Sequence, residues 1–431
     1  MKAAKDIIAV IGLGYVGLPL AHLFAKKYSV IGFDIDNIRI DDLKRGFDKT
    51  RGLKPHELNE VSVNVGNKNV GLKLTSCIDD IRLCNIFIIT VPTPVDSFNV
   101  PDLKYILKAS RMIAMYLKKG DIVIYESTVY PGCTEEECVP ILEKASKLKF
   151  NEDFFVGYSP ERVSPGSQSF ALNNITKITS GSNLEIASKI DLLYSSIIDA
   201  GTYKASSIKV AEAAKVIENT QRDLNISFMN EIALIFDRME IDTTDVLNAA
   251  STKFNFLKFY PGLVGGHCIS VDPYYLTHKA IQLGYYPEVI LSGRRVNNNM
   301  ADFIVKKVIK LMISKDILIK GANVLVLGIT FKENCNDIRN TKVIDIVREI
   351  TEYGVNVHVY DPIADPEDVF REYNIELLKD VPSAAGNYDG IILAVAHNEF
   401  KLVDYKGLRK PKSVIFDAKS FLPRDIIDAR L

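Results

Sequence analysis

The feature that most constrains the fold is a glycine-rich turn, GLGYVG at residues 12–17. It lies between an apolar run at 7–11, which predicts a strand, and an apolar run at 18–27, which predicts a helix. A second predicted strand at 29–33 ends at Asp34. An acid about twenty residues after the first glycine is typical of a dinucleotide-binding βαβ unit. We therefore expect the chain to begin with a Rossmann-like domain.

The positions of this motif have distinct expected roles. Gly12 allows the tight turn, Gly14 lets the backbone approach a pyrophosphate, and Gly17 allows close helix–strand packing. Asp34 is expected to accept hydrogen bonds from the adenosine ribose. Because a carboxylate suits a free 2′-hydroxyl and repels a 2′-phosphate, the sequence favours NAD over NADP.

The apolar segment 7–25 could be mistaken for a secretory signal, since Lys2 and Lys5 precede it. Its glycines and its proline stand at loop-forming spacing, and another predicted strand follows. We therefore expect a folded βαβ unit here, and no membrane span.

The composition argues against several classes of protein. With 53 basic and 54 acidic residues the net charge is −1, which does not fit a nucleic-acid-binding protein. The six cysteines form no CxxC pair and no Cys/His cluster, so we expect no disulfide framework, no metal site and a cytoplasmic location. A length of 431 residues predicts two or three domains.

Further apolar runs predict more strands, for about six in the first domain, at 86–91, 122–125, 154–158 and 177–180. The loops after three of them carry Thr93, Thr128 and Glu161. Since ligands bind at the carboxyl ends of the strands in an open α/β sheet, we expect these residues to contact cofactor or substrate. Ordinary turn formation would also explain the Pro, Ser and Gly residues around them.

A long helix is predicted over 206–239, with a turn at 240–242 and a second helix beginning near Thr243. Lys215, Asn219 and Arg222 in the long helix share one face by their spacing. A row of this kind either lines a site or is simply solvated, and periodicity alone favours neither.

The glycine-rich loop at 259–274 presents Cys268, with Asp272 four residues later. A thiol among small residues can be reached by an electrophile, which makes Cys268 a candidate nucleophile. A buried structural cysteine is the alternative reading. Helices are predicted to follow at 274–283 and 291–313.

A second, smaller α/β unit is predicted from residue 323, without a GxGxxG motif. Its strands are expected at 323–328, 355–360, 390–396 and 413–418, and its first helix at 341–353 with Gly354 as the C-cap. Lys332 and Arg339 lie in its first strand-to-helix loop, where cations suit a phosphate, although exposed loop cations are also common.

The predicted fold class is α/β, with two Rossmann-like doubly wound domains joined by a long central helical segment. The expected domains are an NAD-binding domain at 1–200, a central helical domain with the cysteine loop at 201–315, and a smaller Rossmann-like domain at 316–431.

In order and spacing, these segments resemble the UDP-glucose/GDP-mannose dehydrogenase family over essentially the whole chain. The resemblance is carried by the glycine turn at 12–17, the loops of Thr93, Thr128 and Glu161, EAAKVIEN at 212–219, the Cys268 loop and FKEN at 331–334. Further segments are similar to the branch that oxidises UDP-N-acetylhexosamines, namely VGGHCI at 264–269, VDPYY at 271–275, NTQRDLN at 219–225 and GRR at 293–295. The UDP-glucose branch usually has a lysine before the aspartate.

The resemblance implies a four-electron oxidation of the sugar 6-hydroxymethyl group to a carboxylate, with two NAD and one water. Cys268 would capture the intermediate aldehyde as a thiohemiacetal, and a second hydride transfer would leave a thioester. The other implied catalytic roles are oxyanion stabilisation by Lys215 and Asn219, and acid/base chemistry by Asp272 with Glu161 or Thr128 and a water.

The resemblance also implies that the domain at 201–315 is the dimerisation domain and that the domain at 316–431 binds the UDP-sugar. It further implies two sets of contacts. Those with NAD would come from Gly12, Gly14, Val16, Gly17, Asp34, Arg39, Thr93, Thr128 and Arg339. Those with the nucleotide sugar would come from Glu161, Lys215, Asn219, Tyr260, Gly266 and Lys332. Arg294 is expected to reach the substrate of a neighbouring subunit, because the family dimerises through its central helices, so we expect a homodimer or a larger homo-oligomer.

Two residues depart from the family pattern. Ser270 stands where the branch usually has Gly or Pro, and Asn336 stands where Pro is common. Neither change removes a reactive group, so they affect the expected loop geometry more than the expected activity.

The leading prediction is a dehydrogenase for the 6-hydroxymethyl group of UDP-GlcNAc or UDP-GalNAc, which supplies a uronic acid for surface polysaccharide. The alternatives are a UDP-glucose 6-dehydrogenase, a two-electron hydroxyacid dehydrogenase and a non-catalytic sensor of NAD or nucleotide sugars. We expect His267 to be a spacer, His22 to pack in the core, and the cysteines other than Cys268 to be structural.

Overall fold

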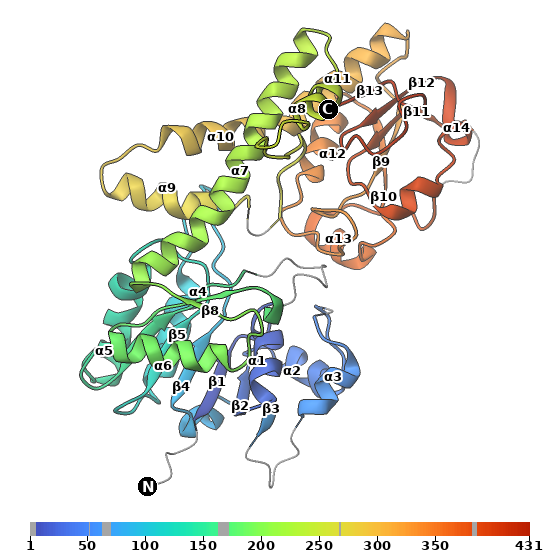
Figure 1. Ribbon diagram of the computed structural model, residues 1–431. Helices are drawn as coiled ribbons and strands as arrows, with labels where there is room; N and C mark the ends of the chain where they lie inside the picture. The colour runs from blue at the N-terminus through green and yellow to red at the C-terminus, as the bar shows by residue number, and fades with distance from the viewer. Residues whose placement is uncertain (1–5, 51, 63–69, 163–171, 267–268, 382–385) are drawn as a thin grey trace. The chain divides into compact units, whose positions relative to one another are not determined.

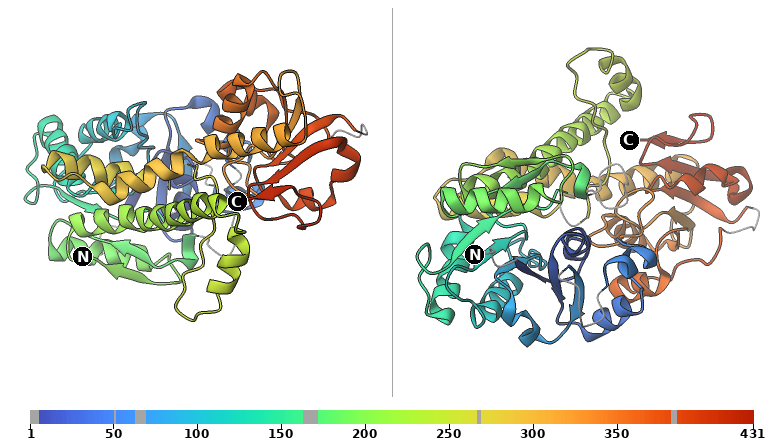
Figure 2. Two further views of the ribbon diagram at one scale, coloured as in Figure 1. Left: turned by 90° about the horizontal axis from the view of Figure 1, so that it is seen from above. Right: turned by 60° about the horizontal axis from the view of Figure 1, so that its bottom comes forward.

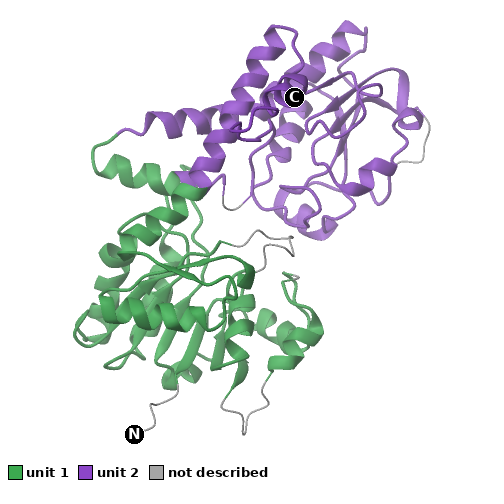
Figure 3. Cartoon of the chain, in the orientation of Figure 1, with its two compact units in different colours: residues 1–218, 274–285 green, residues 219–273, 286–431 purple. Residues whose placement is uncertain are grey.

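The computed structural model describes residues 6–50, 52–62, 70–162, 172–266, 269–381 and 386–431. The chain divides into two compact units (Figure 3). The first consists of residues 1–218 and 274–285, and the second of residues 219–273 and 286–431. The predicted division into three domains is finer than these units and stays a prediction.

The first unit is built on a six-stranded parallel sheet in the order β3-β2-β1-β4-β5-β6 (Figure 1). Its strands are β1 Ile7–Ile11, β2 Ser29–Phe33, β3 Gly71–Thr75, β4 Ile86–Ile89, β5 Ile122–Tyr125 and β6 Phe155–Tyr158. The central strands are apolar and buried, as expected for a parallel sheet covered by helices.

The helices of this unit pack against the sheet (Figure 2). They are α1 Gly17–Ala25, α2 Asn37–Lys44, α3 Pro55–Val61, α4 Lys104–Ala114, α5 Val139–Ser146 and α6 Leu184–Ser195. The apolar residues of 7–25 therefore form a buried strand and a buried helix of the core.

The prediction was wrong about which strand completes this sheet. The segment predicted at 177–180 forms β7 (Lys177–Thr179), which pairs with β8 (Thr202–Lys204) in a separate two-stranded sheet. The sixth strand is β3, which the sequence reading did not include. Lys73 interrupts its apolar run, and this weakened the strand signal.

A single helix of 31 residues, α7 (Ile208–Arg238), begins in the first unit and ends in the second. It is followed by α8 (Thr243–Ala250), which Asp242 caps by accepting a hydrogen bond from the Asp245 N–H. Both helices agree with the predicted positions. The next helix, α9 (Asp272–Gln282), begins at the candidate catalytic aspartate.

The helix predicted at 291–313 is in fact two helices, α10 (Glu288–Asn298) and α11 (Met300–Ser314). Asn299 is the C-cap of the first and the N-cap of the second. The break follows from three successive asparagines at 297–299, because asparagine competes for backbone hydrogen bonds and favours helix ends.

The second unit contains a five-stranded sheet in the order β10-β9-β11-β12-β13. Its strands are β9 Asn323–Leu327, β10 Asn356–Tyr360, β11 Tyr388–Leu393, β12 Arg409–Asp417 and β13 Ala429–Arg430. Its remaining helices are α12 Val343–Glu352, α13 Pro366–Tyr373 and α14 Tyr405–Leu408. Gly354 follows α12 with φ +74°, as expected for a glycine that ends a helix. The fold class is α/β, with two parallel sheets and a long central helix, as predicted.

Candidate active site

The turn between β1 and α1 has the geometry that the GxGxxG motif predicts. Gly12 has φ +95°, and its N–H donates to Phe33 O at 2.8 Å. A Cβ on Gly17 would lie 1.9 Å from Gly12 O and 2.3 Å from Thr90 Oγ1, so a larger residue does not fit. A Cβ on Gly14 would meet no atom within 4 Å. The turn is therefore closed on its sheet side and open at Gly14, where a phosphate can approach.

Asp34 and Arg39 hold this turn from its other side. Asp34 Oδ2 accepts from the Leu13 N–H at 2.8 Å. Arg39 donates to Leu13 O through Nε at 3.1 Å and Nη2 at 2.9 Å. Among the described residues, the buried Nη1 of Arg39 has no hydrogen-bond partner. One edge of the guanidinium can therefore serve an anion.

Asp48 balances the charge of Arg39 at 2.7 Å. Burial alone would raise the pKa of Asp48, but hydrogen bonds from Thr50, Leu53 and Arg39 outweigh it and hold that pKa below its ordinary value. Asp48 therefore favours its charged form and keeps a countercharge beside Arg39.

The loops after β4 and β5 are joined by Thr93 and Thr128. Thr93 Oγ1 donates to Thr128 O at 2.7 Å, and the hydroxyl of Tyr275 donates to Thr93 O at 2.9 Å. Thr93 and Tyr275 are buried, whereas Thr128 is half-buried. The two threonines lie together at the carboxyl edge of the sheet, as the strand positions predict. The sequence did not predict that Tyr275 holds the Thr93 loop through this hydrogen bond.

A buried ion pair lies under the loops of Thr128 and Glu161. Lys177 of β7 is 2% exposed and Glu126, which follows β5, is 1% exposed. Lys177 Nζ donates to Glu126 Oε2 at 2.7 Å and to the carbonyls of Ser159 at 3.3 Å and Pro160 at 2.9 Å. Lys177 thereby joins Glu126, which is two positions before Thr128, to Pro160, which directly precedes Glu161.

The other carboxylate oxygen of Glu126 accepts from the hydroxyl of Tyr194. Burial raises the pKa of Glu126 despite the Lys177 ammonium. The sequence reading missed this network, although a lysine inside a buried strand such as β7 is an available signal for one.

The row predicted on α7 differs in burial along its length. Lys215 is 6% exposed, Asn219 is half-buried and Arg222 is exposed. Asn219 Nδ2 donates to Asp272 Oδ2 at 2.5 Å, so the amide from α7 meets the carboxylate at the start of α9. The helix face that carries these three residues is thus exposed to solvent at Arg222 and buried at Lys215.

Glu212, one turn before Lys215, accepts from the N–H groups of Gly132 at 2.5 Å and Thr134 at 2.9 Å. Burial raises the pKa of Glu212 to about 7, although hydrogen bonds from Thr134 and Gly132 oppose the shift.

Cys268 and His267 lie outside the described residues, but the segment that precedes them is held in two places. Asn230 of α7 donates to Gly262 O at 3.0 Å and accepts from Gly262 N–H at 2.8 Å. Gly266 has φ +86°, and its N–H donates to Asn340 O at 3.1 Å. The loop is therefore fixed before the cysteine by α7 and by the 329–341 segment.

Ser270, one of the departures from the family pattern, closes this loop. Its buried hydroxyl donates to Gly266 O, four residues earlier in the chain. Tyr260, at the start of the same loop, is exposed.

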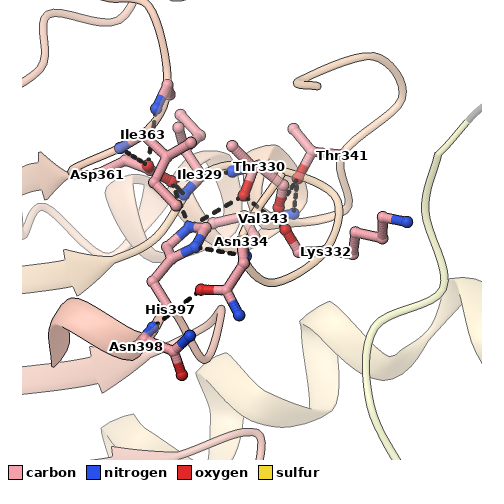
Figure 4. Close-up of polar contacts among 11 residues, drawn as sticks. Ile329, Thr330, Lys332, Asn334, Thr341, Val343, Asp361, Ile363, His397 and Asn398 are labelled. Carbon is pink, nitrogen blue, oxygen red and sulfur yellow. Dashed lines mark hydrogen bonds and ion pairs between the residues drawn. The ribbon is translucent and has the colours of Figure 1, made fainter. Parts of the chain in front are cut away.

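The segment 329–341 follows β9 and carries Lys332, which Figure 4 shows, and Arg339. Lys332 Nζ lies over the ring of Phe331, 5.6 Å from its centroid. Arg339 forms a bidentate pair with Asp337, at 2.9 Å from Nε to Oδ1 and 2.6 Å from Nη2 to Oδ2. A Cβ on Gly266 would lie 2.6 Å from the Phe331 ring, which explains a glycine there.

Arg294 of α10 is buried and pairs with Asp223 of α7 at 2.6 Å. Burial raises the pKa of Asp223, against the opposing effects of Arg294 and Asn297. This pair joins two helices of the second unit. The predicted role of Arg294 at a neighbouring subunit's substrate stays a prediction.

The remaining histidine and cysteine predictions concern packing. His22 is buried in α1, as expected. Among the described cysteines none forms a disulfide, and burial raises the pKa of Cys84 to about 12. Four of them are buried, namely Cys84, Cys133, Cys138 and Cys335, whereas Cys77 is exposed.

Three models of one family match the chain in order. They describe the NAD binding domain at residues 6–198, the central domain at 209–299 and the UDP binding domain at 325–424 of the UDP-glucose/GDP-mannose dehydrogenase family. The UDP-N-acetyl-D-glucosamine 6-dehydrogenase of Pseudomonas aeruginosa is 57% identical over 431 residues, which cover 99% of this chain and 100% of that protein. The chain belongs to the UDP-glucose/GDP-mannose dehydrogenase family.

Further members of the family support this membership. The UDP-N-acetyl-D-glucosamine 6-dehydrogenase of Salmonella typhi is 56% identical, with 98% of each chain covered. The solved structure of a UDP-D-ManNAc dehydrogenase from Pyrococcus horikoshii has a TM-score of 0.86 and 29% identity, with 98% of each chain covered. The protein is an NAD-dependent nucleotide-sugar dehydrogenase, and its substrate is a UDP-sugar, as predicted.

The residues of the first turn fit NAD. The open side of Gly14 and the carboxylate of Asp34 are features that suit a dinucleotide with a free ribose. Within the described residues, no group of three or more histidine, cysteine, aspartate or glutamate side chains is placed to hold a metal ion. None of the helices in the described part of the chain is long and apolar enough to cross a bilayer.

Proposed function

We propose that this dehydrogenase oxidises the 6-hydroxymethyl group of UDP-GlcNAc or UDP-GalNAc to the carboxylate, and that its product supplies surface polysaccharide synthesis. The observation that carries the proposal is the high identity, along the whole chain, to two UDP-N-acetyl-D-glucosamine 6-dehydrogenases. The lower identity to a UDP-D-ManNAc dehydrogenase makes that epimer the weaker candidate.

In this proposal the first unit holds NAD, which accepts the hydride in each of the two oxidations. The turn places backbone groups against the pyrophosphate, Asp34 accepts from the adenosine ribose, and Arg39 offers its unpartnered Nη1 to an anionic oxygen. The full set of proposed NAD contacts is Gly12, Gly14, Val16, Gly17, Asp34, Arg39, Thr93, Thr128 and Arg339.

Cys268 is the proposed nucleophile. Its thiolate sulfur adds to the carbonyl carbon of the aldehyde, and the carbon–oxygen π electrons move to the oxygen. The Lys215 ammonium and the Asn219 amide stabilise the resulting negative oxygen. Loss of the hydride from the same carbon, in the second oxidation, would restore its carbonyl bond and leave a thioester on Cys268. The burial of Lys215 supports this role, because a charge in a dry environment acts on a neighbouring oxyanion more strongly than one in water.

Asp272 is the proposed base for the hydrolysis step. Asn219 donates to Asp272 Oδ2, so the carboxylate is oriented and can accept a proton from the water that attacks the thioester. Cleavage of the carbon–sulfur bond then releases the carboxylate product and returns the thiol. Glu161 or Thr128 assists Asp272 in this acid/base chemistry.

We propose that the phosphates of the nucleotide sugar contact Lys332. Tyr260 and Gly266 contact other parts of the nucleotide sugar. Lys332 carries the cation suited to a phosphate, and the exposure of Tyr260 leaves its ring available to a ligand. We also propose a cytoplasmic homodimer or larger homo-oligomer, in which Arg294 acts at the neighbouring subunit's substrate.

Purified enzyme tests this function when it is supplied with NAD and, in turn, with UDP-GlcNAc, UDP-GalNAc, UDP-ManNAc and UDP-glucose. We expect about two NADH per molecule of the first or second sugar, because the oxidation removes four electrons. A preference for UDP-glucose would contradict the assigned branch. One NADH per sugar, with no carboxylate formed, would contradict the four-electron chemistry.

A further inference from the structure

Two buried residues of the second unit lie directly beneath the loop that carries Lys332 (Figure 4). Asp361 follows β10 and His397 follows β11, and these strands flank β9, from which the Lys332 loop departs. The side chains of both residues are 0% exposed. His397 Nε2 lies 3.1 Å from Asp361 Oδ2.

The hydrogen bonds of His397 determine which nitrogen carries its proton. The Asn334 N–H donates to Nδ1 at 2.9 Å, so Nδ1 must be unprotonated. The proton is therefore on Nε2, which faces Asp361 Oδ2 and, at 3.1 Å, Thr330 Oγ1. An imidazole in this form donates on one side and accepts on the other.

Thr330 extends this arrangement to the backbone of Lys332. Its hydroxyl donates to Lys332 O at 3.0 Å, which leaves Thr330 Oγ1 to accept from His397 Nε2–H. His397 thus supports the loop on both sides of Lys332, through the hydroxyl of Thr330 and the N–H of Asn334. The segments of Asn334 and His397 are joined by a second contact, because Asn334 Oδ1 accepts from the Asn398 N–H at 3.0 Å.

Asp361 fixes the beginning of the same loop. Its Oδ2 accepts from the N–H groups of Ile329 at 2.7 Å and Thr330 at 3.2 Å, and its Oδ1 accepts from Ile363 and Ala364. Burial alone would raise the pKa of Asp361, but the hydrogen bond from His397 and these backbone donors hold the pKa below its ordinary value. The carboxylate is therefore suited to remain charged in its buried position.

We propose that Asp361, His397 and Thr330 form a positioning relay that sets the backbone of Lys332 for the diphosphate of the UDP-sugar. The order of the relay is Asp361 carboxylate, His397 imidazole, Thr330 hydroxyl and Lys332 carbonyl. These are positioning residues, since none is assigned a contact with the substrate. The inference rests on the proposed contact between Lys332 and the nucleotide sugar, and it deepens that proposal.

Thr330→Val tests the relay with the least change of shape, because valine replaces the hydroxyl with a methyl group. The Lys332 carbonyl loses its donor, so we expect the Kd for UDP, measured by calorimetry on the full-length protein, to rise about tenfold. The Kd for NAD should stay within about twofold, because the glycine turn of the first unit is untouched. Thr330→Ser keeps the hydroxyl and should restore UDP binding.

Tyr388→Phe is the matched control for loss of a buried hydroxyl in the same sheet. Tyr388 lies in β11 and meets His358 Nδ1 at 3.0 Å, apart from the Lys332 loop. This variant should keep the wild-type affinity for UDP. If Thr330→Val binds UDP as tightly as the wild type, or if UDP and NAD affinities fall by the same factor, the relay is overturned.

The readout is the affinity for UDP itself, so it does not depend on which sugar is oxidised or on Cys268. If the wild type binds UDP and Thr330→Val binds it about tenfold more weakly, the relay stands even if no N-acetylhexosamine is oxidised. That combination would reject the proposed reaction alone. A wild-type chain without affinity for UDP would reject both.

Discussion

The two Rossmann-like units begin with the same turn and then diverge. Gly12 has φ +95° and donates to Phe33 O at 2.8 Å, and Gly328 has φ +89° and donates to Tyr360 O at 2.8 Å. The acid after the neighbouring strand accepts from the N–H that follows each glycine, at 2.8 Å for Asp34 and 2.7 Å for Asp361.

The third position of each turn makes the difference. It is Gly14 in the first unit, where a Cβ would meet no atom within 4 Å, and Thr330 in the second, where the side chain is buried in a hydrogen-bond relay. A glycine leaves the turn open to a ligand, whereas the threonine places a hydroxyl there that bonds to the protein. A shared strand–turn–acid scaffold therefore indicates a dinucleotide site only when its third position is open.

The largest effect is expected from a variant of Cys268, which should impair the reaction without impairing the binding of NAD or UDP. Cys268→Ser should lower carboxylate formation about a thousandfold, because a hydroxyl is a far weaker nucleophile than a thiolate. The affinities for NAD and UDP should remain near those of the wild type, and aldehyde should accumulate or be released. Cys77→Ser, at an exposed thiol, is the control and should turn over normally. Full turnover by Cys268→Ser would disprove covalent catalysis.

The first unit also supports its loops with a buried pair, which provides a test of stability. Lys177→Met should lower the free energy of unfolding by about 3–5 kcal/mol, because it leaves the Glu126 carboxylate buried without its partner. Urea unfolding measures this change. The double variant Lys177→Met, Glu126→Leu should recover part of the loss. An unchanged unfolding midpoint in the single variant would show that the pair contributes little.

The comparison predicts that such a turn binds a dinucleotide only when its third position is open, and Gly14 allows this prediction to be tested directly. Gly14→Thr copies the residue of the second unit, and no atom of the first unit lies within 4 Å of the added Cβ. We expect the fold to survive and the Kd for NAD to rise about tenfold or more, because the side chain occupies the approach of the pyrophosphate. Fluorescence titration with NAD measures the effect. UDP affinity is the internal control, and normal NAD affinity would refute this prediction.

A third acid that accepts backbone N–H groups extends the comparison. The pKa of Asp361 is lowered, whereas that of Glu212 is raised to about 7. A raised pKa means that Glu212 contributes most stability below its unfolded value near 4.5 and loses that contribution as the pH rises through about 7. This pH-dependent part is at most about 3–4 kcal/mol.

Glu212→Gln tests this pH dependence, because glutamine does not titrate. Between pH 5 and pH 8 the free energy of unfolding of the wild type should fall relative to that of the variant. Urea unfolding at several pH values measures it. Glu143→Gln, on the half-buried Glu143 of α5, is a suitable comparison. A difference that is constant with pH would contradict the raised pKa.

The sequence predicted the elements whose signals are local. Strands β1, β2 and β5 occur at the predicted residues, and the 31-residue α7 ends within two residues of its predicted limits. These elements were predictable because apolar periodicity, glycine turns and helix caps act over a few residues. The βαβ unit and its favoured cofactor followed from the same local signals.

The contacts that shape the site were not predictable in this way. Lys177 and Glu126 are 51 residues apart, and His397 and Thr330 are 67 residues apart. Pairs at such separations leave no local pattern in one sequence. Asn219 and Asp272, at 53 residues apart, could be selected because the family resemblance marks both, although their hydrogen bond could not be.

The contact between Gly266 and Asn340 limits how this enzyme can be redesigned. The cysteine loop and the Lys332 loop share a backbone hydrogen bond, and the Phe331 ring leaves no space for a side chain on Gly266. A graft that brought in the nucleotide loop of another dehydrogenase would therefore also displace the backbone two residues before Cys268. Engineers who want a different nucleotide preference should transplant residues 259–270 and 329–341 as a single cassette from one donor enzyme.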